Sequence, residues 1–150
     1  NKAGSAIGVD QFTYDDTTNV VTIKGDLVAN TITIGSNNNE FSTAHVLFAV
    51  TNSAIANQVL YSIQANTVCS VEYMIIATDP TANTRQTSKL IASVLGSDVG
   101  YYEYGTIDMN GGVGDFKVRQ NAGNIELTVS PMTAHTTNYK IMITSYKEGI

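Results

Sequence analysis

Acidic residues are the side chains in this sequence with the clearest potential for chemistry. Asp79, Asp98, Glu103 and Asp108 lie at or near the expected ends of strands. Two carboxylates about 5 to 9 Å apart can carry out glycoside hydrolysis, and carboxylate oxygens also bind Ca²⁺. Turn formation explains an aspartate at a strand end equally well, and the D-x-D-x-D spacing typical of calcium loops does not occur. We therefore expect neither a catalytic carboxylate pair nor a metal site.

Other catalytic patterns are also missing. The two histidines, His45 and His135, form no H-x-x-H or H-E-x-x-H arrangement, and neither a nucleophile elbow nor a P-loop occurs. The glycine-rich stretch 111–114 opens a strand, so it lacks the helix N-terminus that binds phosphate. The single cysteine, Cys69, allows no intramolecular disulfide and no cysteine-rich zinc site. These observations predict that the chain is not an enzyme and carries no cofactor or metal.

A group of aromatic residues is the best candidate for ligand contact. Two-residue alternation places Tyr102 and Tyr104 on one face of a strand and Tyr101 and Glu103 on the other. Aromatic rings beside acids and amides are typical of sugar-binding surfaces, while tyrosine is equally favoured in strands and at subunit interfaces. Our hypothesis is a ligand-binding surface at Tyr101, Tyr102 and Glu103, with core or interface packing as the alternative.

The composition excludes some classes of partner. Charged residues make up 14% of the chain, below the roughly 25% of typical soluble proteins. Asn and Thr take their place, as is common on extracellular fibres and adhesins. The net charge of −5 favours neither nucleic acid nor anionic lipid as a partner. No apolar run reaches the length of a membrane span, and Asn1–Ile7 lacks the pattern of a signal peptide.

The elements that position these residues are expected to be strands, because two-residue alternation recurs and no window shows helical periodicity. The turn Asn121–Asn124 joins two of them as a hairpin with one buried and one wet face. The expected strands are Val59–Ala65, Val68–Asp79, Thr84–Asp98, Val99–Asp108, Gly114–Gln120, Ile125–Ser130 and Tyr139–Thr144. About seven such strands predict an all-β chain with an antiparallel, jelly-roll-like β-sandwich.

The first part of the chain is expected to be organised differently. Residues 1–41 contain too few large apolar side chains to bury a core alone. Their very short β-prone pieces are Phe12–Tyr14, Val20–Lys24, Leu27–Ala29 and Thr31–Ile34. They predict an extended N-terminal β arm that serves attachment and trimerisation, in which copies from several chains share one core. Residues 42–58 are expected to connect the arm to the β-sandwich domain at 59–150, with Ser42–Ala56 as either a strand or a short helix.

Two of the expected strands are apolar on both faces. Met74 and Ile76 lie opposite the inner face of one strand, and Ile91 and Leu95 lie opposite the inner face of the next. A sheet that is apolar on both sides usually covers something else. We interpret these four residues as an oligomer interface, with cover by the chain's own N-terminal arm as the alternative.

The residues from Val59 onward resemble the C-terminal β-sandwich domain of virion structural, tail-fibre-type proteins of marine tailed phages. The similarity is carried, in order, by Val71-Glu72-Tyr73, Ala77-Thr78-Asp79, Gln86 with Lys89-Leu90, Glu103-Tyr104-Gly105-Thr106, Gly123-Asn124-Ile125, Leu127-Thr128-Val129-Ser130-Pro131 and Tyr139-Lys140-Ile141. The pieces Tyr14–Asn19 and Ile23–Leu27 also look like the short β segments that precede such domains. This chain departs from the family at 95–98, where Leu-Gly-Ser-Asp replaces a frequent His-Asp-Gly turn.

The resemblance implies a homotrimer and no catalytic residue. It predicts a non-enzymatic structural protein on the exterior of the phage particle, as a trimeric fibre or spike in virion architecture or host attachment. The N-terminal arm would dock to other virion proteins, and the sandwich could contact a host-surface glycan. The alternatives are a capsid decoration protein of the cement or head-fibre type, and a carbohydrate-binding adhesin module.

Overall fold

The computed structural model describes residues 12–15, 17, 20–23, 31–36 and 39–147, and nearly all of them lie in antiparallel strands. The elements are β1 (Phe12–Asp15), β2 (Val20–Ile23), β3 (Thr31–Ser36), β4 (Asn39–Thr51), β5 (Gln58–Gln64), the 3-10 turn η1 (Ala65–Thr67), β6 (Ser70–Asp79), β7 (Thr84–Leu95), β8 (Asp98–Met109), β9 (Gly114–Asn121), β10 (Asn124–Pro131) and β11 (Thr137–Tyr146). In this part of the chain, no helix is long and apolar enough to cross a membrane.

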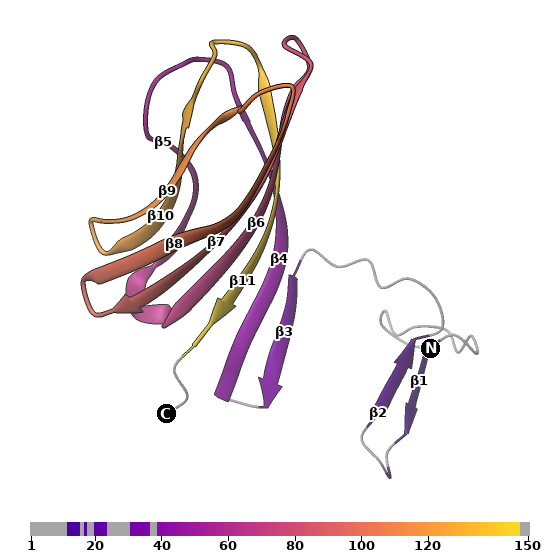
Figure 1. The fold of residues 1–150 in the computed structure, drawn as a ribbon. Helices are drawn as coiled ribbons and strands as arrows, with labels where there is room; N and C mark the ends of the chain where they lie inside the picture. The colour runs from indigo at the N-terminus through magenta and orange to yellow at the C-terminus, as the bar shows by residue number, and fades with distance from the viewer. Residues whose placement is uncertain (1–11, 16, 18–19, 24–30, 37–38, 148–150) are drawn as a thin grey trace.

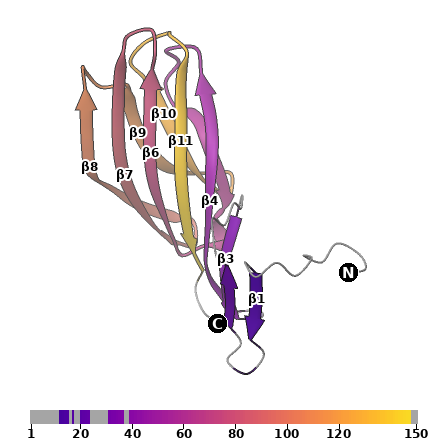
Figure 2. The ribbon, with the colours of Figure 1, turned by 90° about the vertical axis from the view of Figure 1, so that its right-hand side faces the viewer.

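Two sheets face each other, as the two views show (Figures 1 and 2). The larger sheet has six strands in the order β3-β4-β11-β6-β7-β8, and the smaller has three in the order β5-β10-β9. Each neighbouring pair is antiparallel. β1 and β2 pair only with each other among the described strands. The predicted antiparallel β-sandwich is therefore confirmed.

The core lies between the two sheets, and alternation along the strands builds it. One face of each inner strand is apolar and almost inaccessible to solvent. Every second side chain of these strands therefore lies in one buried layer. The ring of Phe116 from the smaller sheet meets the ring of Tyr139 from the larger one edge-on, with centroids 6.2 Å apart. The fully buried apolar side chains are Val71, Tyr73, Ile75, Ala77, Leu90, Ala92, Ile125, Leu127, Val129, Ile141 and Ile143. Burial of each large one contributes about 1.5 to 3 kcal/mol.

The hairpin between β9 and β10 forms at the predicted turn. Asn121 pairs with Asn124 and leaves Ala122 and Gly123 as a two-residue loop. Both loop residues have positive φ, 48° and 82°, as a type I′ turn requires. This turn matches the right-handed twist of its strands, so it sets the register of the whole smaller sheet.

The segment expected to connect arm and sandwich contributes a long strand instead. β4 pairs with β11 over ten residue pairs, from Ser42 to Thr51, and with β3 on its other side. The run Val46–Val50 is apolar at each position, because Leu47 and Ala49 pack on the core while their neighbours face outward. Such a run shows no alternation, so periodicity alone does not separate strand from helix.

Part of the expected N-terminal arm is described. The short β pieces expected at 12–14, 20–24 and 31–34 correspond to β1, β2 and β3. The piece expected at Leu27–Ala29 and the residues 1–11, 16, 18–19, 24–30 and 37–38 lie outside the described residues. The attachment role of residues 1–41 therefore stays a prediction.

Candidate functional site

The outer face of the six-stranded sheet is the candidate functional site. On five neighbouring strands, many of the side chains that point away from the core are apolar. We define the outer face by these residues, which are Val46, Phe48 and Val50 of β4, Met142 of β11, Met74 and Ile76 of β6, Ile91 and Leu95 of β7, and Tyr102, Tyr104, Ile107 and Met109 of β8. Because paired residues in antiparallel strands share a face, register decides which of these side chains are neighbours.

Register places the apolar side chains in rows across the sheet. In one row, Met142 lies between Val46 and Met74. In the next row, Phe48 pairs with Lys140, which in turn pairs with Ile76. Phe48 is 72% exposed, and the Lys140 ammonium lies 5.8 Å from its ring centroid, within the range of a cation–π contact. These rows make the outer face largely apolar, with Lys140, Lys89 and Thr87 as interruptions.

The four residues predicted as an oligomer interface do not lie equally close together. Met74 and Ile76 are half-buried at the centre of the sheet. Ile91 pairs with Glu72 in the adjacent row. Leu95 is 80% exposed and lies at the last position of β7. Three of the four therefore lie within the outer face, and Leu95 lies at its end.

Sequence reasoning missed half of this surface. Val46, Phe48 and Val50 were left in a segment of undecided structure, and Ile107 and Met109 were not singled out. The available signal was the continuous apolar run of β4, which is typical of a strand with partners on both faces.

The predicted ligand residues lie on β8, at one edge of the larger sheet. Tyr102 pairs with outward-facing Ile91, whereas Tyr101 and Glu103 pair with inward-facing Ala92 and Leu90. The structure therefore places Tyr101, Tyr102 and Glu103 on one strand but not on one face. Tyr101 is nonetheless 41% exposed, because it lies at the sheet edge.

A β-bulge at Tyr104 reshapes this edge. Leu90 pairs with Glu103 while Lys89 pairs with Gly105, so Tyr104 is the extra residue. Its hydroxyl donates a hydrogen bond of 2.5 Å to Oε1 of Glu72, across β7. That hydrogen bond raises the pKa of Tyr104, with further contributions from desolvation and the negative charge of Glu72.

The bulge also lets the Thr106 hydroxyl donate to Glu103, three residues earlier in the strand. In a regular strand, residues at this spacing point to opposite faces. The inner side of β8 therefore carries a fixed polar pair next to Tyr101, and the alternation of the sequence did not predict it.

The outer face of the smaller sheet is polar by contrast. Arg119 donates through Nε to Oε2 of Glu126 at 2.9 Å, and Asn121 donates to Oε1 at 3.0 Å. The hydrogen bond from Asn121, together with the hydrogen bond and charge of Arg119, lowers the pKa of Glu126 against the effect of desolvation. Each carboxylate oxygen therefore has a partner within the sheet.

Asp79 has a structural role. Its carboxylate accepts hydrogen bonds from the backbone N–H groups of Thr81 and Ala82 at 2.9 Å and from the hydroxyl of Thr133 at 2.8 Å. His135 Nδ1 lies 3.0 Å from Oδ2. The hydrogen bond from Ala82, helped by Thr133 and His135, lowers the pKa of Asp79 to about 2. The contacts of Asp79 with Thr133 and His135 therefore join the β6–β7 turn to the β10–β11 loop.

The two aspartates of β8 lie near opposite ends of that strand. Asp108 pairs with Gln86 and Asp98 with Leu95, nine residues further along β7, which corresponds to about 30 Å. Across the described ranges, no group of three or more His, Cys, Asp or Glu side chains could hold a metal ion. The backbone of His45 lies in β4, but its side chain is outside the described part.

Comparison with known proteins gives structural neighbours only. No protein-family model matches the sequence, and no curated protein matches it. The tailspike protein of Acinetobacter baumannii phage AM24 is similar, with a TM-score of 0.50 and 10% identity over 72% of this chain. The tailspikes of Acinetobacter baumannii bacteriophage Fri1 and Acinetobacter phage vB_ApiP_P1 are similar with TM-scores of 0.47, at 14% and 11% identity over 81% and 86% of this chain.

The chain spans 26%, 21% and 25% of those three proteins. At these identities the likeness concerns the fold. The neighbours are tailspikes of Acinetobacter phages, whereas the sequence resemblance pointed to marine tailed phages.

The prediction that the chain is not an enzyme needs correction. The Fri1 tailspike is described as a capsular polysaccharide depolymerase, which contradicts a prediction based on missing motifs. The physical reason is that glycoside-cleaving carboxylates come from separate strands and are recognised by their distance in space. The absence of a local motif therefore excludes little, and the prediction is not retained.

Proposed function

We propose that this chain is the β-sandwich module of a phage tail spike or tail fibre, which assembles with copies of itself on the exterior of the virion. The observation that carries the proposal is the large number of exposed apolar side chains on the outer face of the six-stranded sheet. The resemblance from Val59 onward supports a trimer as the form of that assembly and virion architecture or host attachment as its role.

The exposure of the outer face supports self-association. Phe48, Ile107 and Met109 are all more than half exposed on this one face. The row from Phe48 to Ile107 also contains Ile76, with Lys140 and Thr87 between the apolar residues. Monomeric soluble proteins rarely leave large contiguous apolar patches in water. Burial against another subunit stabilises such a surface by about 25 cal/mol per Å².

Residues 1–41 serve in this proposal as the attachment arm, which docks to other virion proteins. The edge strand β8 is the proposed place for contact with a host-surface glycan, through Tyr101 and Glu103. Tyr102 lies on the outer face and would join the contact only where assembly leaves it uncovered. A capsid decoration protein and a carbohydrate-binding adhesin are the competing functions. Immunogold labelling of phage particles distinguishes a tail location from a capsid location.

The test of assembly is the solution mass of the purified chain, measured by light scattering at several concentrations. We expect a stable species of three times 16.0 kDa. A monomer at each concentration would contradict self-association of the chain.

A matched pair of variants then tests the outer face itself. Val46 of β4 is 42% exposed, and Val59 of β5 is 49% exposed on the outer side of the smaller sheet. We expect Val46→Asp to yield monomers and Val59→Asp to remain assembled, with both retaining the circular dichroism of strands. Assembly by Val46→Asp would show that another surface joins the subunits.

A further inference from the structure

The outer face of the six-stranded sheet carries three exposed cations among its apolar side chains. Register places one of them in each of three neighbouring rows that run across β4, β11, β6, β7 and β8, and it places no Asp or Glu in these rows. The cations and one paired neighbour of each are Lys89 with Met74, Lys140 with Ile76, and Arg85 with Met109. The centre of the outer face is therefore both apolar and positively charged.

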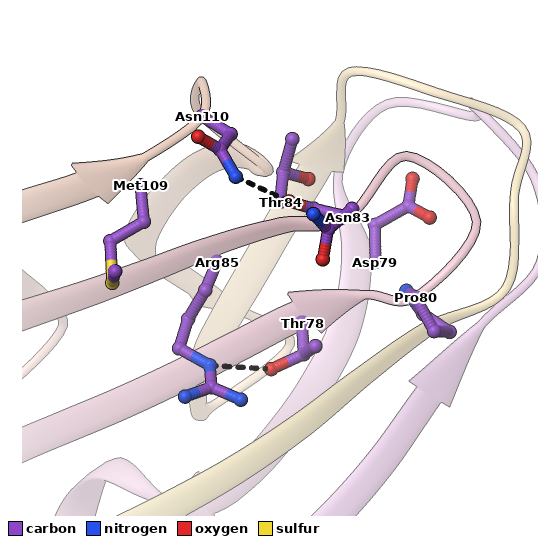
Figure 3. A pocket seen from close by; sticks show the side chains of 8 residues that line it. All are labelled: Thr78, Asp79, Pro80, Asn83, Thr84, Arg85, Met109 and Asn110. Atoms are coloured by element: carbon purple, nitrogen blue, oxygen red, sulfur yellow. Dashed lines mark hydrogen bonds between the residues drawn. The ribbon is translucent and has the colours of Figure 1, made fainter.

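Arg85 shows that these charges have no partner within the described part of the chain. Figure 3 shows Arg85, Thr78 and Met109 on one side of the sheet, with the Asp79 carboxylate directed away from Arg85. Nε of Arg85 donates to the hydroxyl of Thr78 at 3.3 Å, and both residues line a cavity of about 220 Å³ together with Asn110. Among the described residues, none of the three cations forms an ion pair.

The three cations oppose direct packing of two outer faces on each other. Such a contact would bring like charges of two copies together in a region that excludes water, and like charges across an interface are unfavourable. A segment that covers the outer face well should therefore combine apolar side chains with carboxylates.

The hairpin of β1 and β2 lies in a stretch with both properties. Register pairs Phe12 with Ile23 and, two positions further along, Tyr14 with Val21. Because successive pairs alternate between the two faces of a hairpin, these two apolar pairs share one face. The stretch 10–26 contains four aspartates and one lysine, which gives a net charge of −3.

The hairpin also needs a surface to pack on. Each of its strands has four residues, and an isolated two-stranded hairpin is at best marginally stable in water. Among the described strands, β1 and β2 pair only with each other. The free edge of the sheet at β8 suits the hairpin less well, because the charged residues of β8 are the acids Asp98, Glu103 and Asp108.

We propose that the β1–β2 hairpin of one subunit packs on the outer face of a neighbouring subunit. Its apolar face covers the rows of Met74 and Ile76, and the acidic stretch 10–26 lies near the three cations. The inference rests on the proposed self-assembly and names the segment that joins the subunits. Cover by the chain's own hairpin is the alternative, and it would bury the same apolar surface without joining two copies.

A matched pair of variants of the full chain tests the role of the hairpin. Val21→Asp places a charge on the apolar face, and Thr22→Asp places the same charge on the opposite face. We expect Val21→Asp to weaken self-association at least about tenfold in sedimentation, because a buried unpaired carboxylate is costly. Thr22→Asp should assemble as the parent does, and both variants should keep the circular dichroism of strands.

The outcomes of this comparison separate the two proposals. Assembly of Val21→Asp at the strength of the parent would overturn the role of the hairpin and leave self-assembly standing. A parent chain that is itself monomeric would overturn the assembly and, with it, the exchange of hairpins.

Disulfide trapping distinguishes a neighbour's hairpin from the chain's own. In a Cys69→Ala background, Val21→Cys is combined in one full-length chain with Met142→Cys or Phe48→Cys, which are outward positions of β11 and β4. Exchange between copies predicts covalent species at multiples of 16.0 kDa on a denaturing gel. The same pairs built with Thr22→Cys should link much less. A link only within one chain, or no link at either position in an assembled sample, would overturn the exchange.

A change of charge tests the contribution of the cations. Asp15→Asn should weaken self-association about twofold to fivefold, as expected for partly exposed charge pairs, and added salt should reduce the difference from the parent. Asp115→Asn removes an exposed charge from the outer side of the smaller sheet and should leave assembly unchanged. Equal effects of the two changes would overturn the charge complementarity on which the inference rests.

Discussion

The outer faces of the two sheets follow the same two-residue alternation but carry opposite kinds of side chain. On the smaller sheet, Arg119 and Glu126 form an ion pair, and Lys117 pairs with Thr128 in the next row. On the larger sheet, Phe48 and Met142 occupy equivalent outward positions. The inner faces are alike because both line one core. The outer faces differ in polarity, and this difference indicates whether water or another subunit is the more favourable surrounding for each face.

The energetics of the two faces differ in the same direction. Arg119 is exposed and Glu126 is largely buried, and each Glu126 carboxylate oxygen has a hydrogen-bond partner within the sheet. The outer face of the smaller sheet therefore needs no further partner to satisfy this carboxylate. Exposed apolar side chains gain free energy only when something removes them from water. This difference supports our proposal that subunits assemble through the larger sheet while the smaller sheet faces solvent. Each prediction below tests part of that proposal.

The largest effect is expected from a charge at the centre of the outer face. Met74→Asp or Ile91→Asp should weaken self-association by about 3 kcal/mol or more, over a hundredfold, because a buried unpaired carboxylate opposes assembly. Sedimentation measures the loss, and strand content should persist by circular dichroism. As a control, Ser62→Asp on the outer side of the smaller sheet should still assemble. A variant at Met74 or Ile91 that sediments as the parent does would exclude that part of the face as the interface.

Tyr73, the neighbour of Met74 in β6, should affect the stability of the fold and leave assembly unchanged. Tyr73 points inward, is fully buried, and its hydroxyl has no hydrogen-bond partner among the residues that the structure describes. Because an unsatisfied buried hydroxyl is costly, Tyr73→Phe should raise the free energy of unfolding by about 1 kcal/mol and leave assembly unchanged. Urea denaturation of the monomeric Val46→Asp background, with and without the second change, separates stability from association. A loss of stability would show that the hydroxyl has a partner.

The outer face of the smaller sheet should respond to acid. Because the folded pKa of Glu126 is lowered, its contribution to stability is fully present above its unfolded pKa and lost as pH falls through the folded value. Glu126→Gln should lower the free energy of unfolding at neutral pH by at most about 1 kcal/mol. It should also make the further loss of stability at acidic pH smaller than in the parent. The midpoint of urea denaturation, measured between pH 7 and pH 3, reports both effects. An equal loss of stability with falling pH in parent and variant would contradict the contribution of the ion pair.

The smallest effect is expected at the edge strand. Tyr104→Phe removes the hydrogen bond to Glu72 and should lower the free energy of unfolding slightly, because the bond is exposed to solvent. The raised pKa of Tyr104 means that its contribution is present at neutral pH and is lost as pH rises through the folded value. The difference in stability between parent and variant should therefore shrink in strong alkali. A difference that persists there would assign the effect to packing.

Much of the fold could be predicted because it is encoded locally. The strands from Val59 onward and the turn at Asn121–Asn124 follow from alternation and turn chemistry. β4 was left undecided because its apolar run has no period. Of the candidate site, Met74, Ile76 and Ile91 were found from the sequence. Their partners on β4 and β8 were missed, because the sequence of a single strand does not specify which strands lie beside it in the sheet.

The sequence by itself determined which residues of a strand point to opposite sides, because side-chain direction follows from backbone geometry. Only the tertiary structure decided which strands are neighbours. It brought Asp79 to His135 across 56 residues, set Phe48 beside Lys140, and placed Arg85 next to Asn110 in one cavity. Pairing between distant strands depends on the closure of the whole sheet and its core, so no local pattern specifies it.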